Sequence, residues 1–142
     1  MNKPVLYLRI ASVLTFIHAV LHTVGGVFGK VDPGPVATAV EAMKANTFPI
    51  MGNVRSFWMF YRGLGLAATV SLTAESILMW QLASLARTEP KRLRPMMATF
   101  VAAYLALAIN SNAYFFPPPV IVEILIAACF GMAILTASKN AA

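Results

Sequence analysis

Four long apolar segments make up most of this 142-residue chain. They cover residues 5–28, 57–85, 96–116 and 120–136, and each is close to the roughly 20 residues that a helix needs to cross a bilayer. A spanning segment has no water to satisfy its backbone groups, so it forms a helix that bonds to itself. The sequence therefore predicts an all-α, polytopic membrane four-helix bundle that forms a single domain over residues 1–142.

The amino-acid composition excludes an ordinary water-soluble domain. Hydrophobic residues account for 59% of the chain and charged residues for 11%, whereas soluble domains carry about a quarter charged residues. The formal net charge of +6 comes from basic residues in short connections, and no nucleic-acid-binding motif surrounds them. The expected partner is the lipid bilayer, and no nucleic-acid partner is predicted.

The positions of lysine and arginine predict the orientation of the chain. Four basic residues lie in ARTEPKRLRP, between the second and third apolar segments. Lys3 and Arg9 lie around the start of the first segment, and Lys139 follows the fourth. Because short cytoplasmic loops are enriched in Lys and Arg, both termini and this basic loop are expected in the cytoplasm. The connection of residues 29–55 and the FPPP turn then face the outer side.

The first outer connection, residues 29–55, is the only long one. It begins with KVDPGP, which predicts a turn, and continues with VATAVEAMKAN, where apolar residues repeat at the spacing of one helical face. The pattern predicts a short amphipathic helix that ends at NTFPIMGN. Such a helix can serve as a plain connector or as a lid over the mouth of the bundle.

Ionisable side chains inside the apolar segments are the strongest functional signal, because burying them in lipid costs several kcal/mol unless they are paired or hydrated. The first segment holds His18 and His22, and the second holds Glu75. A rise of about 1.5 Å per residue puts His18 and Glu75 at nearly the same depth, near the midplane. Removal from water disfavours their charged forms, so these three residues are the candidate catalytic residues, with Glu75 as acid and one histidine as base.

Other polar residues are expected to extend this site into a column from the outer mouth to the midplane. Each has a structural alternative as well: Glu123 lies at a helix start, where the helix dipole favours a carboxylate, Arg62 can extend to lipid headgroups, and asparagine can bridge helices. The candidate ligand-binding residues are Arg55, Tyr61, Arg62, Asn110, Asn112 and Glu123.

No metal or other cofactor is predicted. The spacing H-x3-H puts His18 and His22 on one helix face, but the chain lacks the acid that zinc proteases carry between them and the E-x-x-H pairs of di-iron bundles. Two histidines on one face cannot supply opposite axial ligands of a haem. The single cysteine, Cys129, excludes a disulfide within the chain and a cysteine-based metal cluster.

Two stretches carry a resemblance to a known family. LRIASVLTFIHAVLHTVGGVFG and FPIMGNVRSFWMFYRGLGL, followed by SILMW, resemble a family of small uncharacterised bacterial four-span membrane proteins, and the LRIASVL start is similar to DoxX-like four-helix proteins. The resemblance implies the four-span fold and a bacterial inner membrane, and it brings no established activity. The positions that match the family pattern are His22, Thr23, Gly25, Gly52, Arg55, Tyr61, Gly63 and Gly65.

Three hypotheses about function are open at this point, and only the first makes the protein an enzyme. In the first, the polar pocket binds a lipophilic small molecule and transforms it by acid–base chemistry, as an isomerase or an epoxide hydrolase does. In the second, the chain is a structural or accessory subunit of a membrane complex, and its polar residues only join helices. In the third, it is a small transporter, which four spans allow only as a homodimer.

Overall fold

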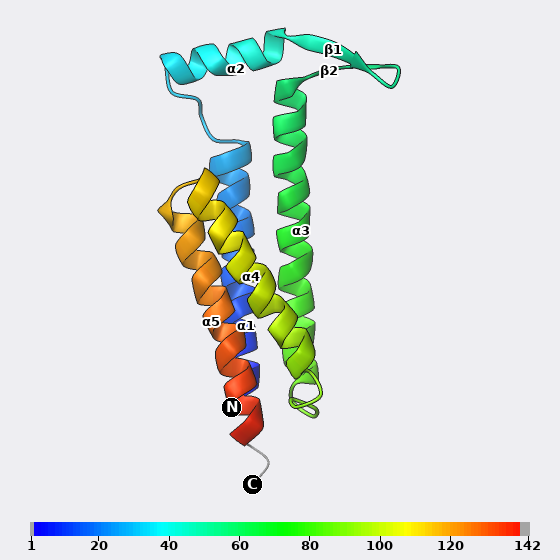
Figure 1. Cartoon of the computed structure of the whole chain (residues 1–142), viewed down its shortest axis with the longest axis vertical. Helices are drawn as coiled ribbons and strands as arrows, with labels where there is room; N and C mark the ends of the chain where they lie inside the picture. Colours follow the sequence, from blue (N-terminus) through cyan, green and yellow to red (C-terminus); the bar gives the residue numbers. More distant parts are fainter. Residues whose placement is uncertain (1, 140–142) are drawn as a thin grey trace. The chain divides into compact units, whose positions relative to one another are not determined.

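The structure, a computed structural model, describes residues 2–139 and is almost entirely helical (Figure 1). The predicted all-α class is confirmed. The elements in chain order are α1 (Lys3–Leu21), the π-helical turn η1 (His22–Val27), α2 (Pro35–Ala45), β1 (Thr47–Ile50), β2 (Asn53–Ser56), α3 (Phe57–Leu85), α4 (Arg94–Tyr114) and α5 (Pro117–Lys139).

Four of these helical segments are long and apolar enough to cross a membrane, as the sequence predicts. They are Lys3–Val27, Phe57–Leu85, Arg94–Tyr114 and Pro117–Ala137. The last begins three residues before the predicted start at residue 120, because prolines 117–119 form its first turn. The backbone N–H groups of a first turn have no partner within the helix, so proline loses nothing there.

The chain divides into two compact units. The first consists of the residues up to His18 and those from Leu72 onward, and the second of Ala19–Ser71. The first unit contains most of α1, the later part of α3, and α4 and α5, which run side by side (Figure 1). The second contains η1, α2, both strands and the earlier part of α3.

The core of the first unit draws side chains from four helices. Phe130 of α5 is fully buried and its ring stacks on that of Phe100 of α4, with ring centroids 4.7 Å apart. Alanines recur among the other core residues, and small side chains let helix backbones approach closely. The buried core residues are Val5, Leu8, Ala11, Met79, Leu82, Ala83, Ala86, Met97, Tyr104, Ile126, Ala127, Phe130 and Ala133.

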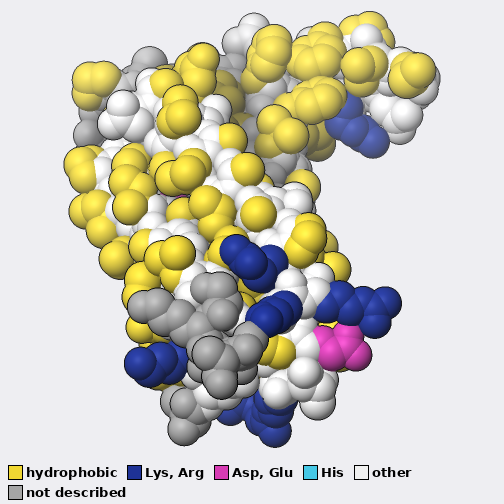
Figure 2. All heavy atoms as spheres, turned by 60° about the horizontal axis from the view of Figure 1, so that its bottom comes forward, with side chains coloured by type: hydrophobic (Ala, Val, Ile, Leu, Met, Phe, Trp, Pro, Cys, Tyr) yellow, Lys and Arg dark blue, Asp and Glu magenta, His cyan; other side chains and the backbone are white. Residues whose placement is uncertain are grey.

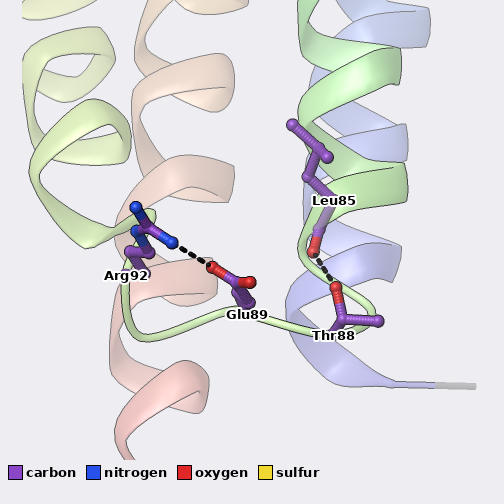
Figure 3. A network of polar contacts seen from close by, with 4 residues as sticks. All are labelled: Leu85, Thr88, Glu89 and Arg92. Carbon is purple, nitrogen blue, oxygen red and sulfur yellow. Dashed lines mark hydrogen bonds and ion pairs between the residues drawn. The ribbon is translucent and has the colours of Figure 1, made fainter.

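The connection between α3 and α4 is held by local hydrogen bonds on the basic end of the first unit (Figure 3). Thr88 Oγ1 donates to the carbonyl oxygen of Leu85 at 3.2 Å, and Arg92 Nη1 pairs with Glu89 Oε2 at 3.1 Å. Both partners of the ion pair are exposed, so solvent screens it and it contributes less than about 1 kcal/mol. The turn is therefore held mainly by its hydrogen bonds, which include those from the backbone N–H groups of Thr88 and Glu89 to the Leu85 carbonyl, both at 3.2 Å.

The second unit contains a β-hairpin that the sequence analysis did not predict. β1 pairs antiparallel with β2, from Thr47 opposite Ser56 to Ile50 opposite Asn53. Met51 and Gly52 form the two-residue loop with φ values of 48° and 78°, as a type I′ turn requires. Phe48 anchors β1, because its ring centroid lies 5.0 Å from that of Phe57 at the start of α3.

The outer connection also contains the predicted short helix, α2. None of its residues is buried, but Ala37, Val40 and Met43 are half-buried and follow one another at helical spacing.

Helix α3 begins directly after the hairpin, where the Ser56 hydroxyl accepts a hydrogen bond from the backbone N–H of Met59 at 3.3 Å. Ser56 is therefore the N-cap residue of α3, and the helix begins at Phe57, where the second apolar segment was predicted to begin.

Replacing Met51 with asparagine is expected to stabilise the hairpin. A positive φ costs most L-residues about 1 kcal/mol or more, and asparagine tolerates it better, so amide exchange in β1 and β2 should slow about fivefold. Hydrogen–deuterium exchange resolved by residue measures this. Met51→Leu keeps the strained conformation and should leave exchange unchanged. An equal slowing in both variants would contradict the assignment of strain to Met51.

Candidate functional site

A hydrogen-bonded group in the first unit joins Glu75 of α3 to α4 and α1. Tyr104 Oη donates to Glu75 Oε2 at 2.7 Å, and the Tyr104 hydroxyl lies 3.3 Å from Thr15 Oγ1. Tyr104 and Thr15 are fully buried, whereas Glu75 is half-buried. We call these three residues the Glu75 cluster. It gives the intramembrane carboxyl group a fixed donor on one oxygen.

Helical spacing explains why these three side chains meet. On α4, Tyr104, Ala108 and Ser111 are buried at intervals of four and three residues and so share one face. On α3, the buried face begins at Ser76, and Glu75 lies at its edge. That edge position explains why the carboxyl group reaches Tyr104 while the Glu75 side chain stays partly exposed.

Two serines connect α1 and α3 close to this cluster in sequence. Ser12 Oγ donates to the backbone carbonyl of Ser76 at 2.8 Å, and Ser76 Oγ donates to the carbonyl of Ser12 at 3.0 Å. Both residues are buried. Reciprocal bonds of this kind satisfy each hydroxyl without water, so they fix the two helices against each other in a medium that offers no alternative partner.

Glu123, predicted as a ligand-binding residue, is buried between the end of α4 and the start of α5. Ser111 Oγ donates to Glu123 Oε1 at 2.9 Å, and only 4% of the Glu123 surface is exposed. Within residues 2–139, Glu123 Oε2 has no hydrogen-bond partner. The contact with Ser111 joins two consecutive helices, whereas the alternative considered for Glu123 was a carboxylate in the first turn of a helix, and the first turn of α5 contains no acidic residue.

In the second unit, His22 contacts the backbone of α3. Its Nε2 lies 3.0 Å from the carbonyl oxygen of Gly65. A carbonyl only accepts, so Nε2 carries the proton and donates it. Thr69 Oγ1 donates to the same carbonyl at 3.2 Å and lies 2.9 Å from Thr23 Oγ1. His22, Thr23 and Gly65 belong to the pattern on which the family resemblance rests, and the structure brings these three together.

The remaining candidates of the second unit lie on or near the outer connection. Arg55 is exposed on β2, and its Nη2 donates to Asn53 Oδ1 at 3.2 Å. Tyr61 is exposed and stacks on Trp58, with centroids 5.5 Å apart. The Arg62 guanidinium lies over the ring of Phe28, 4.9 Å from its centroid. Each of the three is thus held by a neighbour from its own unit.

The candidates that are left belong to the first unit. His18 is half-buried on α1. Asn110 and Asn112 are exposed on α4, and Asn112 lines a shallow hollow of about 220 Å³ at the turn into α5. Neither asparagine belongs to the Glu75 cluster. The other residues that line the hollow are Phe115, Phe116, Pro117, Val120 and Ile121.

The sequence analysis missed the hydroxyl groups that contact the two intramembrane acids. Tyr104 holds Glu75, and Ser111 holds Glu123. A signal was present, because these two residues lie seven positions apart and therefore share a helical face in a largely apolar segment. Thr15 gave no such signal, since threonine is common in membrane helices as a donor to its own backbone, here to the carbonyl of Ala11 at 2.9 Å.

Across residues 2–139, no group of three or more His, Cys, Asp or Glu side chains is arranged to hold a metal ion. The Glu75 cluster itself offers a carboxyl group, a phenol and an alcohol in hydrogen-bond contact. Searches among protein families, characterised proteins and solved structures find no match to this chain.

Proposed function

We propose that this membrane protein binds a lipophilic small molecule at the Glu75 cluster and transfers a proton to it. The supporting observation is the 2.7 Å hydrogen bond from Tyr104 Oη to Glu75 Oε2 within helices that are apolar and long enough to cross a bilayer. A carboxyl group in such a segment is costly, and its usual reason is function. Because Glu75 is only half-buried, a molecule dissolved in the bilayer can reach it.

The proposed chemistry needs no cofactor. In a double-bond isomerisation, Glu75 donates a proton to one alkene carbon, and a base removes one from the allylic carbon on the other side. In the opening of an epoxide, Glu75 protonates the leaving oxygen while water attacks the carbon. Tyr104 holds the carboxyl group in one orientation for either reaction. We propose His18 as the base, since the Nε2–H of His22 is engaged by the Gly65 carbonyl.

Native mass spectrometry of the protein extracted gently from its own membranes tests this proposal. We expect one organic molecule bound per chain, absent in Glu75→Gln. Tyr104→Phe should weaken its binding about tenfold, because it removes a hydrogen bond to an acidic group. Glu123→Gln is the matched control and should retain the adduct. A bare mass for the folded wild-type protein, or survival of the same adduct in Glu75→Gln, would overturn the proposal. A bound phospholipid has its own mass and is not counted as this adduct.

A second candidate function, an accessory subunit of a membrane complex, is supported by the buried contacts that join helices. Ser12 with Ser76, and Ser111 with Glu123, use polar side chains only to connect helices. If the Glu75 cluster serves the same purpose, the same mass spectra should contain a second protein and no small molecule. A homodimer without a ligand would instead favour the transporter hypothesis.

The orientation of the chain is part of the proposal. Arg87, Lys91 and Arg92 in the α3–α4 connection, with Arg94 at the start of α4, support a cytoplasmic location for this connection and for both termini. The likeness of residues 8–29 and 48–66 to small bacterial four-span proteins supports a bacterial inner membrane. Cysteine labelling from outside the cell, at Met51→Cys in the hairpin and at Thr88→Cys in the basic connection, distinguishes the two orientations.

A further inference from the structure

A shallow groove of about 340 Å³ lies on the first unit between α1 and α3. One cationic residue, Arg9, stands among otherwise apolar side chains. Ile10, Val13 and Trp80 each leave between 40% and 47% of their surface exposed, so the groove is open to the surroundings. The lining residues are Arg9, Ile10, Val13, Leu14 and Trp80.

Arg9 lacks an anionic partner in the described part of the chain. The ion pairs found between residues 2 and 139 are Lys44 with Glu41 and Arg92 with Glu89. The Arg9 guanidinium instead lies over the Trp80 ring, 4.7 Å from its centroid, and its Nε is buried with no hydrogen-bond partner in residues 2–139. Contact with an aromatic face leaves the N–H donors of a guanidinium available to an anion, and they match phosphate well.

Arg9 and Trp80 lie within two helical turns of the ends of their helices, close enough for the long Arg9 side chain to reach the level of lipid headgroups. Arg9 lies six residues after the first residue of α1, about 9 Å along the helix, and its side chain is tilted toward the helix N-terminus. Trp80 lies five residues, about 8 Å, before the last residue of α3. Arginine stems and tryptophan rings both favour the boundary between hydrocarbon and headgroups.

The surroundings of the groove are positively charged. Lys and Arg side chains gather at the end of the first unit that carries the α3–α4 connection, with acidic atoms beside them (Figure 2). The connection itself contributes Arg87, Lys91 and Arg92 against Glu89. Basic sites between membrane helices near a membrane surface attract anionic headgroups.

We propose that this groove binds an anionic phospholipid, with its phosphate on the Arg9 guanidinium and one acyl chain along Ile10, Val13 and Leu14. A free phosphate would leave the apolar wall of the groove uncovered, whereas a lipid covers it. A zwitterionic lipid brings its own cation toward Arg9 and the basic connection, which disfavours it. The site is separate from the Glu75 cluster and does not depend on the function proposed for that cluster.

The test uses the full-length protein in vesicles of equimolar phosphatidylglycerol and phosphatidylcholine, extracted gently and weighed by native mass spectrometry. We expect bound phosphatidylglycerol to exceed phosphatidylcholine about fivefold, the factor that one basic side chain contributes at an anionic membrane surface. Arg9→Gln should abolish the preference, and Arg9→Lys should keep part of it. Arg92→Gln removes a charge of the connection at a residue that does not line the groove, so it is the control and should retain most of the preference.

A second variant tests the apolar part of the site with Arg9 unchanged. Val13→Trp fills the groove, and we expect the bound lipid to be lost while the protein remains folded by circular dichroism. Equal retention of both lipids by the wild-type protein would overturn the proposal. An equal loss in Arg92→Gln and Arg9→Gln would also overturn it, because binding would then reflect the charge of the whole surface.

Discussion

Replacing Phe130 with alanine is expected to lower the free energy of unfolding by about 3 kcal/mol. The Phe130 side chain is fully buried in the first unit and stacks on Phe100, with interplanar angle 9°. In a bilayer the loss does not come from exposure to water, because lipid tails are as apolar as the core. It comes from the cavity left behind, whose walls lose their dispersion contacts.

Reversible unfolding in mixed micelles, followed by circular dichroism, measures the effect of Phe130→Ala. Phe16→Ala is the matched control, since Phe16 also lies in a membrane-spanning helix but leaves 52% of its surface exposed. Its removal should change the unfolding free energy by less than about 0.5 kcal/mol. If both variants lose the same stability, the four helices do not form the core described for the first unit.

Gly65→Ala is expected to lower the unfolding free energy by about 2 kcal/mol through overpacking. A Cβ atom at this position would lie 2.9 Å from Val27 Cγ2, and Val27 is itself buried. To relieve this contact η1 and α3 must move apart, which would also separate the Gly65 carbonyl from the His22 ring. Gly63→Ala is the control, because a Cβ there has no neighbour within 4 Å. Alanine is the better helix former, so this variant should be neutral or more stable by up to about 1 kcal/mol.

A double-mutant cycle attributes the Gly65→Ala effect to its contact. Adding Val27→Ala makes room for the new methyl group. The double variant should therefore lose about 1 kcal/mol less unfolding free energy than the two single variants lose together. Thermal unfolding of the four proteins in one detergent gives this coupling. Additive effects, or equal losses in Gly63→Ala and Gly65→Ala, would show that Val27 does not limit the approach of η1 to α3.

The spanning helices could be predicted from the sequence because lipid imposes a simple rule. A segment of about 20 apolar residues has one way to satisfy its backbone, and its ends follow from prolines and charges. The start of α3 at Phe57 agrees with the prediction for this reason. No such rule applies to the outer connection. The hairpin there has strands of four residues, includes Pro49, and turns at a methionine, so neither alternation nor turn chemistry predicted it.

The candidate site was harder to predict than the fold. The intramembrane acids could be found, because a carboxyl group in an apolar segment is conspicuous. Their partners were missed. The spacing of Tyr104 and Ser111 places both on one face of α4, but helical spacing alone does not say that this face meets Glu75 and Glu123. Asn110 lies in α4, yet it is exposed, since its direction around the helix differs from that of the buried Ser111.

The π-helical turn η1 has a consequence for comparing this chain with other sequences. The backbone N–H of Phe28 bonds to the carbonyl of Thr23, five residues earlier, whereas an α-helix bonds four residues earlier. A homologue with an unbroken α-helix here needs one residue fewer between Leu21 and Phe28. Its correct alignment with this chain contains a one-residue gap, and an ungapped alignment would pair residues from different sides of the first span.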